Sequence, residues 1–197
     1  MTDHLQVMID EWSGDYRTTF LALEEDKALD NMTSSITELS RSELAIELMA
    51  VALSNQDQED EHSCFSDNTH RDIRLKLEGV ANVYNGPYNN STDAASLASL
   101  ITEAKAVLGA ELNTLLSTAI IQTNNTLIPF DLAIVNGATI TEGAKEQLAV
   151  QALVAFGNKL LEARVALGIN YMFNFKLNSS LFRDQFFFHL TIKSIFQ

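Results

Sequence analysis

The most chemically loaded stretch of the sequence is QDQEDEHSCFSDNTHRD, residues 56–72. It contains two carboxylate–imidazole pairs, Glu59 with His62 and Asp67 with His70, and in each pair the histidine follows the carboxylate by three residues. Such a pair offers the oxygen and nitrogen ligands that zinc or iron takes in proteins. The spacing therefore makes Glu59, His62 and His70 candidate metal ligands. The alternative is that the acidic run is a solvated surface, which is the usual state of charge runs.

Three hydroxyl residues recur at every third position of the same stretch: Ser63, Ser66 and Thr69. Short polar side chains of this kind cap helices and form turns. Thr69 with Asp72 three residues later predicts a capping box, and Asp67 would favour the start of the same helix. That helix is expected to run towards Tyr84 and to stop at Asn85-Gly86-Pro87, a strong turn signal.

Apolar residues at helical spacing place this stretch in an all-α protein. Leu44, Leu48, Val51 and Ala52 follow an i, i+4, i+7, i+8 pattern in a segment, about 28–54, that lacks Pro and Gly. The pattern recurs over 108–120 and 149–167. We expect residues 1–169 to form an up-down, antiparallel helical bundle.

The composition changes after Gly168. Seven of the eleven phenylalanines lie in residues 170–197, and Lys176, Arg183 and Lys193 against Asp184 give this tail a net charge of +2. Tyr171, Phe173, Phe175 and Leu177 alternate in the manner of a strand. We therefore predict that the tail is an atypical hydrophobic segment outside the bundle. A chain cut after Ile169 is expected to be at least as helical and as soluble as the full chain. The alternative is that the tail covers apolar surface that the bundle leaves bare.

The overall composition excludes several classes of protein. A net charge of −13 argues against nucleic acid as a partner, because phosphate binding needs a basic face. No apolar run is long enough for a transmembrane segment, and the single cysteine, Cys64, cannot form an internal disulfide. The N-terminus shows no signal peptide, so we expect the chain as written to stay in the cytoplasm.

Several stretches, taken in order, resemble the iron-regulated protein A branch of the imelysin family. The most specific is NQDQEDEHSCFSDNTHRDI, residues 55–73. Three others have family counterparts: SELAIE (42–47), NVYNG (82–86) and the PFDLA turn (129–133). The final helix, residues 153–169, is similar as well, so the resemblance covers about residues 3–169.

This resemblance implies an all-helical, two-lobed cell-envelope or periplasmic protein that is linked to iron uptake. Each lobe of the family is a modified four-helix bundle, and a site is proposed in the cleft between the lobes. Residues 1–169 would then correspond to the C-terminal lobe, with the dense loop as one wall of the cleft. The residues expected to face the cleft are Glu47, Glu61, Ser63, Ser66, Asp67 and Thr69.

The sequence also departs from the family. The family was first described as metallopeptidases because of a Gly-x-His-x-x-Glu motif, but none of the four histidines here has Glu three residues later. Leu48 stands where relatives have Arg, and the tail matches nothing in the family. We therefore expect a truncated or split copy without the N-terminal lobe, which is not an active peptidase alone.

The leading hypothesis is an iron-uptake protein of the envelope that binds a metal or an iron compound, with iron or zinc as the ion. Its expected partners are a separately encoded N-terminal lobe or other iron-uptake components. Two alternatives remain: a metallopeptidase of the imelysin type, and an inactive remnant.

Overall fold

A computed structural model of the chain describes residues 2–86, 95–135 and 140–169. Within these ranges every regular element is a helix or a helical turn, and no strand occurs. In order, the elements are α1 (Thr2–Ser13), α2 (Asp15–Leu21), α3 (Glu25–Glu38), η1 (Leu39–Ala50), α4 (Val51–Asn55), η2 (Gln58–Asp60), η3 (Cys64–Ser66), α5 (Thr69–Asn85), α6 (Leu97–Ala104), α7 (Ala106–Asn124), η4 (Phe130–Ala133) and α8 (Ile140–Ala166). The all-α prediction is confirmed.

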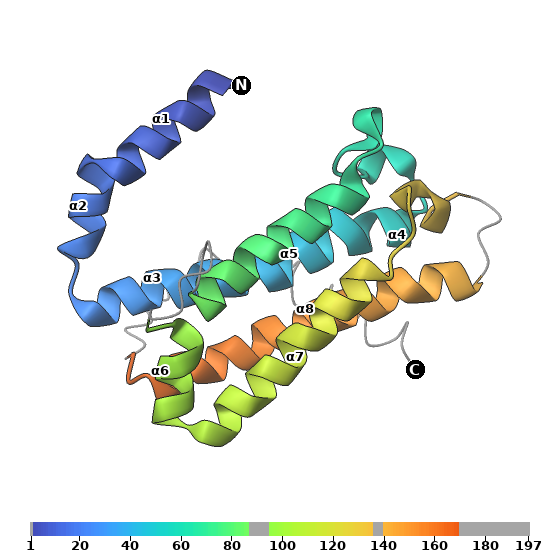
Figure 1. Cartoon of the computed structure of the whole chain (residues 1–197). Helices are drawn as coiled ribbons and strands as arrows, with labels where there is room; N and C mark the ends of the chain where they lie inside the picture. The colour runs from blue at the N-terminus through green and yellow to red at the C-terminus, as the bar shows by residue number, and fades with distance from the viewer. Residues whose placement is uncertain (1, 87–94, 136–139, 170–197) are drawn as a thin grey trace, which may run out of the picture.

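In the described part of the chain, four long helical rods run up and down side by side (Figure 1). The first is the continuous helix α3–η1–α4, and the others are α5, α7 and α8. Helix α8 packs against both α7 and the first rod, while α5 closes the ring by packing against η1 and α7. Helix α6 is a short addition that folds back on α7. This is the up-down bundle that the helical apolar stripes predicted.

The apolar stripes meet in one core. Leu44, Leu108, Leu112, Leu153 and Phe156 are almost fully buried there. Tyr84 of α5 meets Phe156 of α8 edge to face, with ring centroids 5.7 Å apart, a favourable geometry for aromatic pairs. The Tyr84 hydroxyl donates to Asn113 Oδ1 at 3.1 Å, and burial raises the pKa of this tyrosine to about 12.

The first rod contains a wide, π-helical segment, η1, that the sequence pattern did not reveal. In the turns before it and at its start, the hydroxyls of Thr33, Thr37 and Ser40 each donate to the carbonyl four residues back. Such bonds compete with the backbone ladder and bend helices. Gly157 of α8 lets this rod approach closely, because a Cβ there would lie 2.8 Å from Arg41 Cβ.

The predicted capping box at the start of α5 is wrong. Asn68 is the N-cap, Thr69 is the first helical residue, and no side-chain cap bond is made. Instead the Thr69 hydroxyl accepts from the Ser63 backbone N–H at 2.9 Å. The Asp72 carboxylate accepts from the Ser63 hydroxyl at 2.5 Å. Both side chains hold the preceding loop against α5, so they do not cap the helix.

The predicted helix end at Gly86 is confirmed, and the last helix, expected to reach residue 169, ends earlier at a second glycine. Helix α5 stops at Gly86, with φ +79°, and the last helix stops at Gly168, with φ +74°. At the second end Gly168 N–H donates to Val165 O and Ile169 N–H donates to Arg164 O, the two bonds of a Schellman motif. The strand pattern at 171–177 and the whole tail, 170–197, lie outside the described residues. None of the described helices is long and apolar enough to cross a membrane.

Candidate cation site at the end of the bundle

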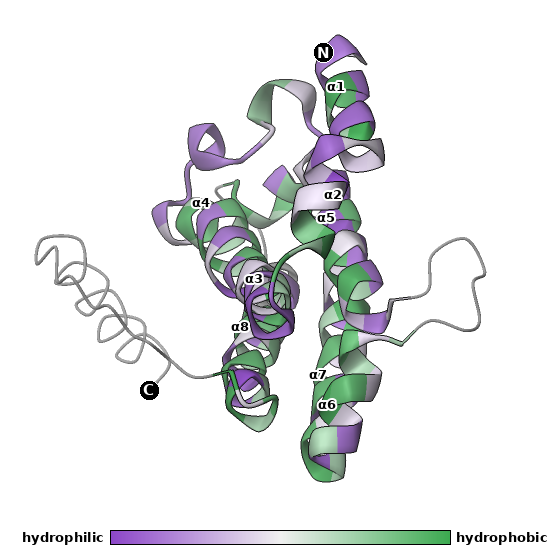
Figure 2. Ribbon diagram, turned by 90° about the vertical axis from the view of Figure 1, so that its left-hand side faces the viewer, coloured by the Kyte–Doolittle hydropathy of each residue, from purple (hydrophilic) through white to green (hydrophobic). Residues whose placement is uncertain are grey.

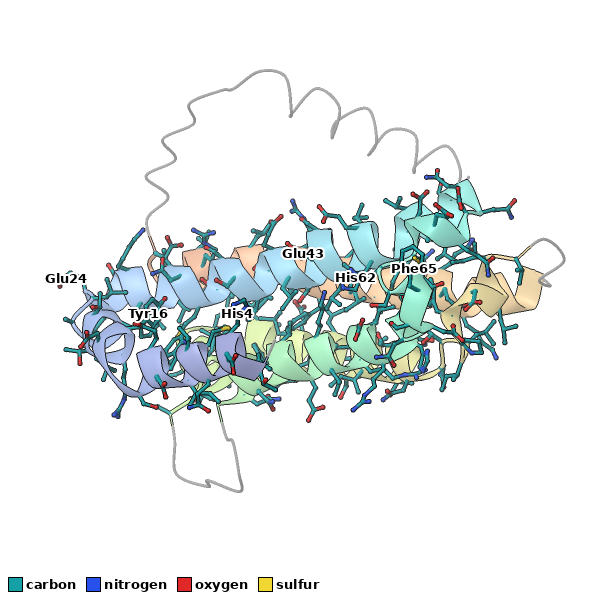
Figure 3. The ribbon with its side chains drawn as sticks, turned by 90° about the horizontal axis from the view of Figure 1, so that it is seen from above. His4, Tyr16, Glu24, Glu43, His62 and Phe65 are labelled. Carbon is teal, nitrogen blue, oxygen red and sulfur yellow. The ribbon has the colours of Figure 1, made fainter. Side chains whose placement is uncertain are left out.

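The dense loop, residues 56–68, connects α4 to α5 at the end of the bundle away from the α2–α3 connection. Figure 3 shows His62 and Phe65 of this loop displaced along the bundle from Glu24. Gln56 begins the loop in the left-handed region, with φ 52°. Asp57 then accepts from the Glu59 backbone N–H at 2.9 Å, and Asp60 accepts from Asn55 Nδ2 at 2.6 Å. Asp57 and Asp60 are thus explained by local loop structure.

The predicted hydroxyl residues also have structural partners. Ser63 is tied to Thr69 and Asp72 as described above, and the Ser66 hydroxyl donates to the Ser63 carbonyl at 3.2 Å. Ser66 is exposed, whereas Thr69 is fully buried. These contacts fix the loop onto α5, so the shape of the loop is determined by its own hydroxyls.

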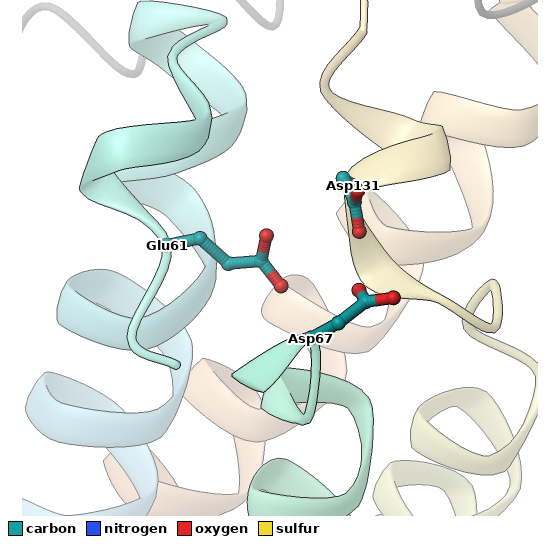
Figure 4. A group of neighbouring side chains, drawn as sticks. All are labelled: Glu61, Asp67 and Asp131. Carbon is teal, nitrogen blue, oxygen red and sulfur yellow. The ribbon is translucent and has the colours of Figure 1, made fainter. Parts of the chain in front are cut away.

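Three carboxylates converge where this loop meets the turn η4: Glu61, Asp67 and Asp131 (Figure 4). One ligand oxygen from each lies within 4.8 Å of the others. Glu61 is buried, at 4% exposure, while Asp131 is half-buried and Asp67 is exposed. The cluster, which we call the carboxylate triad, therefore has one wall inside the protein and one side open to solvent.

The triad is rich in acceptors and poor in donors. Asp131 Oδ2 accepts from Gln58 Nε2 at 3.1 Å, and the Thr69 hydroxyl bonds to the Glu61 carboxyl. Glu61 Oε1 and Asp131 Oδ1 are buried without a hydrogen-bond partner among the described residues. Buried polar atoms are normally satisfied, so these two oxygens lack a partner that a cation or a proton would supply.

The electrostatics of the triad favour the uptake of positive charge. Burial raises the pKa of the Glu61 carboxyl, with further raising by Asp131 and Asp67, while the Thr69 hydroxyl lowers it. The pKa of Asp67 is raised first by a hydrogen bond with Asp131 and then by desolvation and the Asp131 charge. Three carboxylates at this distance cannot all stay ionised without cost, which is the situation that a bound cation relieves.

The predicted metal ligands have different positions. Glu59 and His62 are exposed and do not belong to the triad, and His62 Nε2 lies 3.3 Å from Lys76 Nζ. His70 is half-buried, its Nδ1 has no partner among the described residues, and its charge acts on Asp67 by lowering the pKa of that carboxyl. His70 therefore borders the triad, whereas Glu59 and His62 are not part of it.

Of the predicted cleft residues, the structure brings Glu61 and Asp67 together. Glu47 is exposed on η1 and is not part of the triad. The third member, Asp131, was missed as a site residue, although its PFDLA turn stood out in the sequence. Nothing in the local sequence connects this turn with residues 61 and 67. The available indication was that Asp131 is a carboxylate in a stretch that resembles the family.

Asp131 is positioned by a buried polar network under its turn. Arg74 of α5 donates to the Thr126 carbonyl at 3.0 Å and to the Thr126 hydroxyl at 3.2 Å. The Leu127 backbone N–H donates to the fully buried Glu146 of α8 at 2.6 Å. Burial lowers the pKa of Arg74, and the Glu146 charge opposes that shift. The network joins α5 and α8 to the segment that leads through the cis Ile128–Pro129 bond into η4.

Comparison with known proteins gives one family. The sequence model of the imelysin family, which carries a peptidase label, matches residues 1–162. No curated protein matches the chain. The matched range contains the whole carboxylate triad.

Proposed function

We propose that this chain, which belongs to the imelysin family, binds a metal cation at the carboxylate triad as an accessory protein of iron uptake in the cell envelope. The observation that carries the proposal is the pair of buried, unpartnered oxygens, Glu61 Oε1 and Asp131 Oδ1, on two carboxylates that converge in the triad. The iron-uptake and envelope parts of the proposal come from the family.

The donor set determines which cations fit. Carboxylate oxygens are hard ligands and suit hard cations, whereas zinc prefers imidazole and thiolate. The triad offers three carboxylates, and the Nδ1 of His70 is a nearby nitrogen. This donor set disfavours zinc, and the family's link to iron uptake makes iron the expected ion. Glu61, Asp67 and Asp131 would hold the ion, and the open side at Asp67 would leave positions for water or for an iron ligand.

The rest of the chain supports cation capture. The sequence carries a net charge of −13, and a field of that sign raises the local concentration of cations. Partners that complete the site, such as a separately encoded N-terminal lobe or other iron-uptake components, belong to the same proposal. They would cover the open side of the triad.

Isothermal titration calorimetry of the full chain with Fe²⁺ under anaerobic conditions, and with Zn²⁺ and Ca²⁺, tests the proposal. We expect Fe²⁺ to bind, and Asp131→Asn to weaken it by at least about tenfold, the lower end of the loss seen when a metal site loses a supporting group. Glu59→Gln is the matched control, because Glu59 is exposed on the same loop, and it should bind like the parent chain. Equal affinity in both variants, or no binding even with an added N-terminal lobe, would contradict the proposal.

A further inference from the structure

The N-terminal arm, helices α1 and α2, stands outside the bundle. None of its residues is buried by the described part of the chain, and the two helices pack chiefly on each other. Figure 2 shows α1 with green apolar segments beside purple polar ones, clear of the bundle helices. The arm joins α3 through residues 22–24.

One face of the arm is apolar. Leu5, Met8, Ile9 and Trp12 follow i, i+3, i+4, i+7 spacing, and each is half exposed or more. The face continues into α2, where the Trp12 ring lies 4.7 Å from Tyr16 and 5.8 Å from Phe20 between centroids. A helix of 12 residues is marginal in water by itself, and contiguous apolar surfaces of this kind usually mark an interaction site. The arm therefore needs a cover.

The chain leaves the described structure beside the base of this arm. Arg164, in the last turn of α8, forms an ion pair with Asp30 near the start of α3. The Gly168 turn ends the helix directly afterwards, and Ile169 is buried at this end of the bundle. The tail, residues 170–197, thus begins near the point where α2 joins α3. We propose that this tail covers the apolar face of the N-terminal arm.

The chemistry of the two segments is complementary. The tail contributes seven phenylalanines and a net charge of +2. The arm presents the apolar face together with four carboxylates, Asp3, Asp10, Glu11 and Asp15, against the single cation Arg17. Opposite charge around an apolar contact favours the correct pairing and its register.

The tail is also long enough to reach. Its 28 residues span up to roughly 90 Å when extended, while the helical arm of 20 residues is about 30 Å long. A tethered segment has a high effective concentration at a nearby surface, so the chain's own tail has an advantage over a second copy. The inference is independent of the carboxylate triad, which lies at the other end of the bundle.

Trp12 is the only tryptophan of the chain, so its fluorescence in the full chain reports on this face. We expect acrylamide to quench it weakly in the parent protein. The triple substitution Phe186→Ser, Phe187→Ser, Phe188→Ser should raise the quenching constant and shift the emission to longer wavelength. Val107→Ser, which changes an exposed apolar residue on α7, should leave both unchanged. Unchanged far-UV circular dichroism shows that the bundle is intact.

A second variant tests the contact from the arm side. Asp10→Lys with Glu11→Lys removes the arm's excess of negative charge and should expose Trp12 in the same way, whereas Glu43→Lys on the exposed side of η1 should not. Size-exclusion chromatography with light scattering distinguishes covering by the chain's own tail from covering by a second copy. The parent should be monomeric, and its quenching should be independent of protein concentration. Strong quenching in the parent, no effect of either variant, or protection that appears only in a dimer would overturn the inference.

Discussion

Replacing Glu61 with Gln should stabilise the metal-free protein. The pKa of Glu61 in the folded chain is raised, mainly by burial, so ionising this group at neutral pH costs free energy of folding. Gln keeps the shape, removes the charge, and brings an amide donor into a cluster of carboxylate oxygens. We expect a gain of about 1 kcal/mol, within the range found when a strained functional site is relieved. For a chain of this length that is roughly 2–4 °C in Tm.

The same substitution should remove the stabilisation by a cation. A cation at 100 times its Kd stabilises the folded state by about 2.7 kcal/mol, which corresponds to roughly 5–11 °C in Tm for this chain length. Loss of a direct ligand should weaken binding at least about 100-fold, since losing even a supporting group costs 10–100-fold. At the same cation concentration the variant then gains only about 0.4 kcal/mol.

Thermal unfolding of both proteins, with Fe²⁺ and after chelation, measures the two effects together. Glu61→Gln should melt higher than the parent without metal and lower with it. The exposed Glu59→Gln should follow the parent in both conditions. If Glu61→Gln melts lower than the parent without metal, Glu61 is a structural residue of the loop and the reasoning from its buried charge is wrong.

Three further predictions concern pH, backbone and packing. The pKa values of Glu61 and Asp67 are raised in the fold, so the metal-free protein should lose stability as pH rises from the ordinary carboxyl range, about 4, through the raised values. Urea unfolding across this pH range measures the free energy of unfolding. A free energy of unfolding that increases with pH there would contradict the prediction. Asp67 has φ 54°, so Asp67→Ala should be less stable than Asp67→Gly by about 1 kcal/mol, the cost of a left-handed residue with a Cβ; equal denaturation midpoints would refute this. Gly157→Val should lower the free energy of unfolding by about 1–3 kcal/mol, because even its Cβ would lie 2.8 Å from Arg41 Cβ. Gly79→Ala is the control, since its Cβ would enter open space, and it should not destabilise by overpacking in the same chemical denaturation assay.

The sequence alone determined the fold class, because helical periodicity is a local property. The stripe Leu108, Leu112 and Leu116 predicted a buried helix face, and all three residues are buried. The helix end at Gly86 was also readable, since only the residue at that position has to adopt the left-handed backbone. The π-helical η1 was not, because its wide turns coincide with a specific packing of α8 against the first rod.

Two of the three carboxylates of the candidate site were identified from the sequence and the third was not. The resemblance drew attention to Glu61 and Asp67 as cleft residues, whereas the ligand spacing pointed to Glu59 and His62, which share the loop but are not part of the triad. Only the tertiary structure brought Asp131, from a turn 64 residues after Asp67, within 4.8 Å of both. It also showed that Thr69 and Asp72, which were expected to cap α5, bond to Ser63 instead. A periodicity is set by neighbours along the chain, whereas burial, charge and contact at a site depend on which distant segments the packed helices bring together.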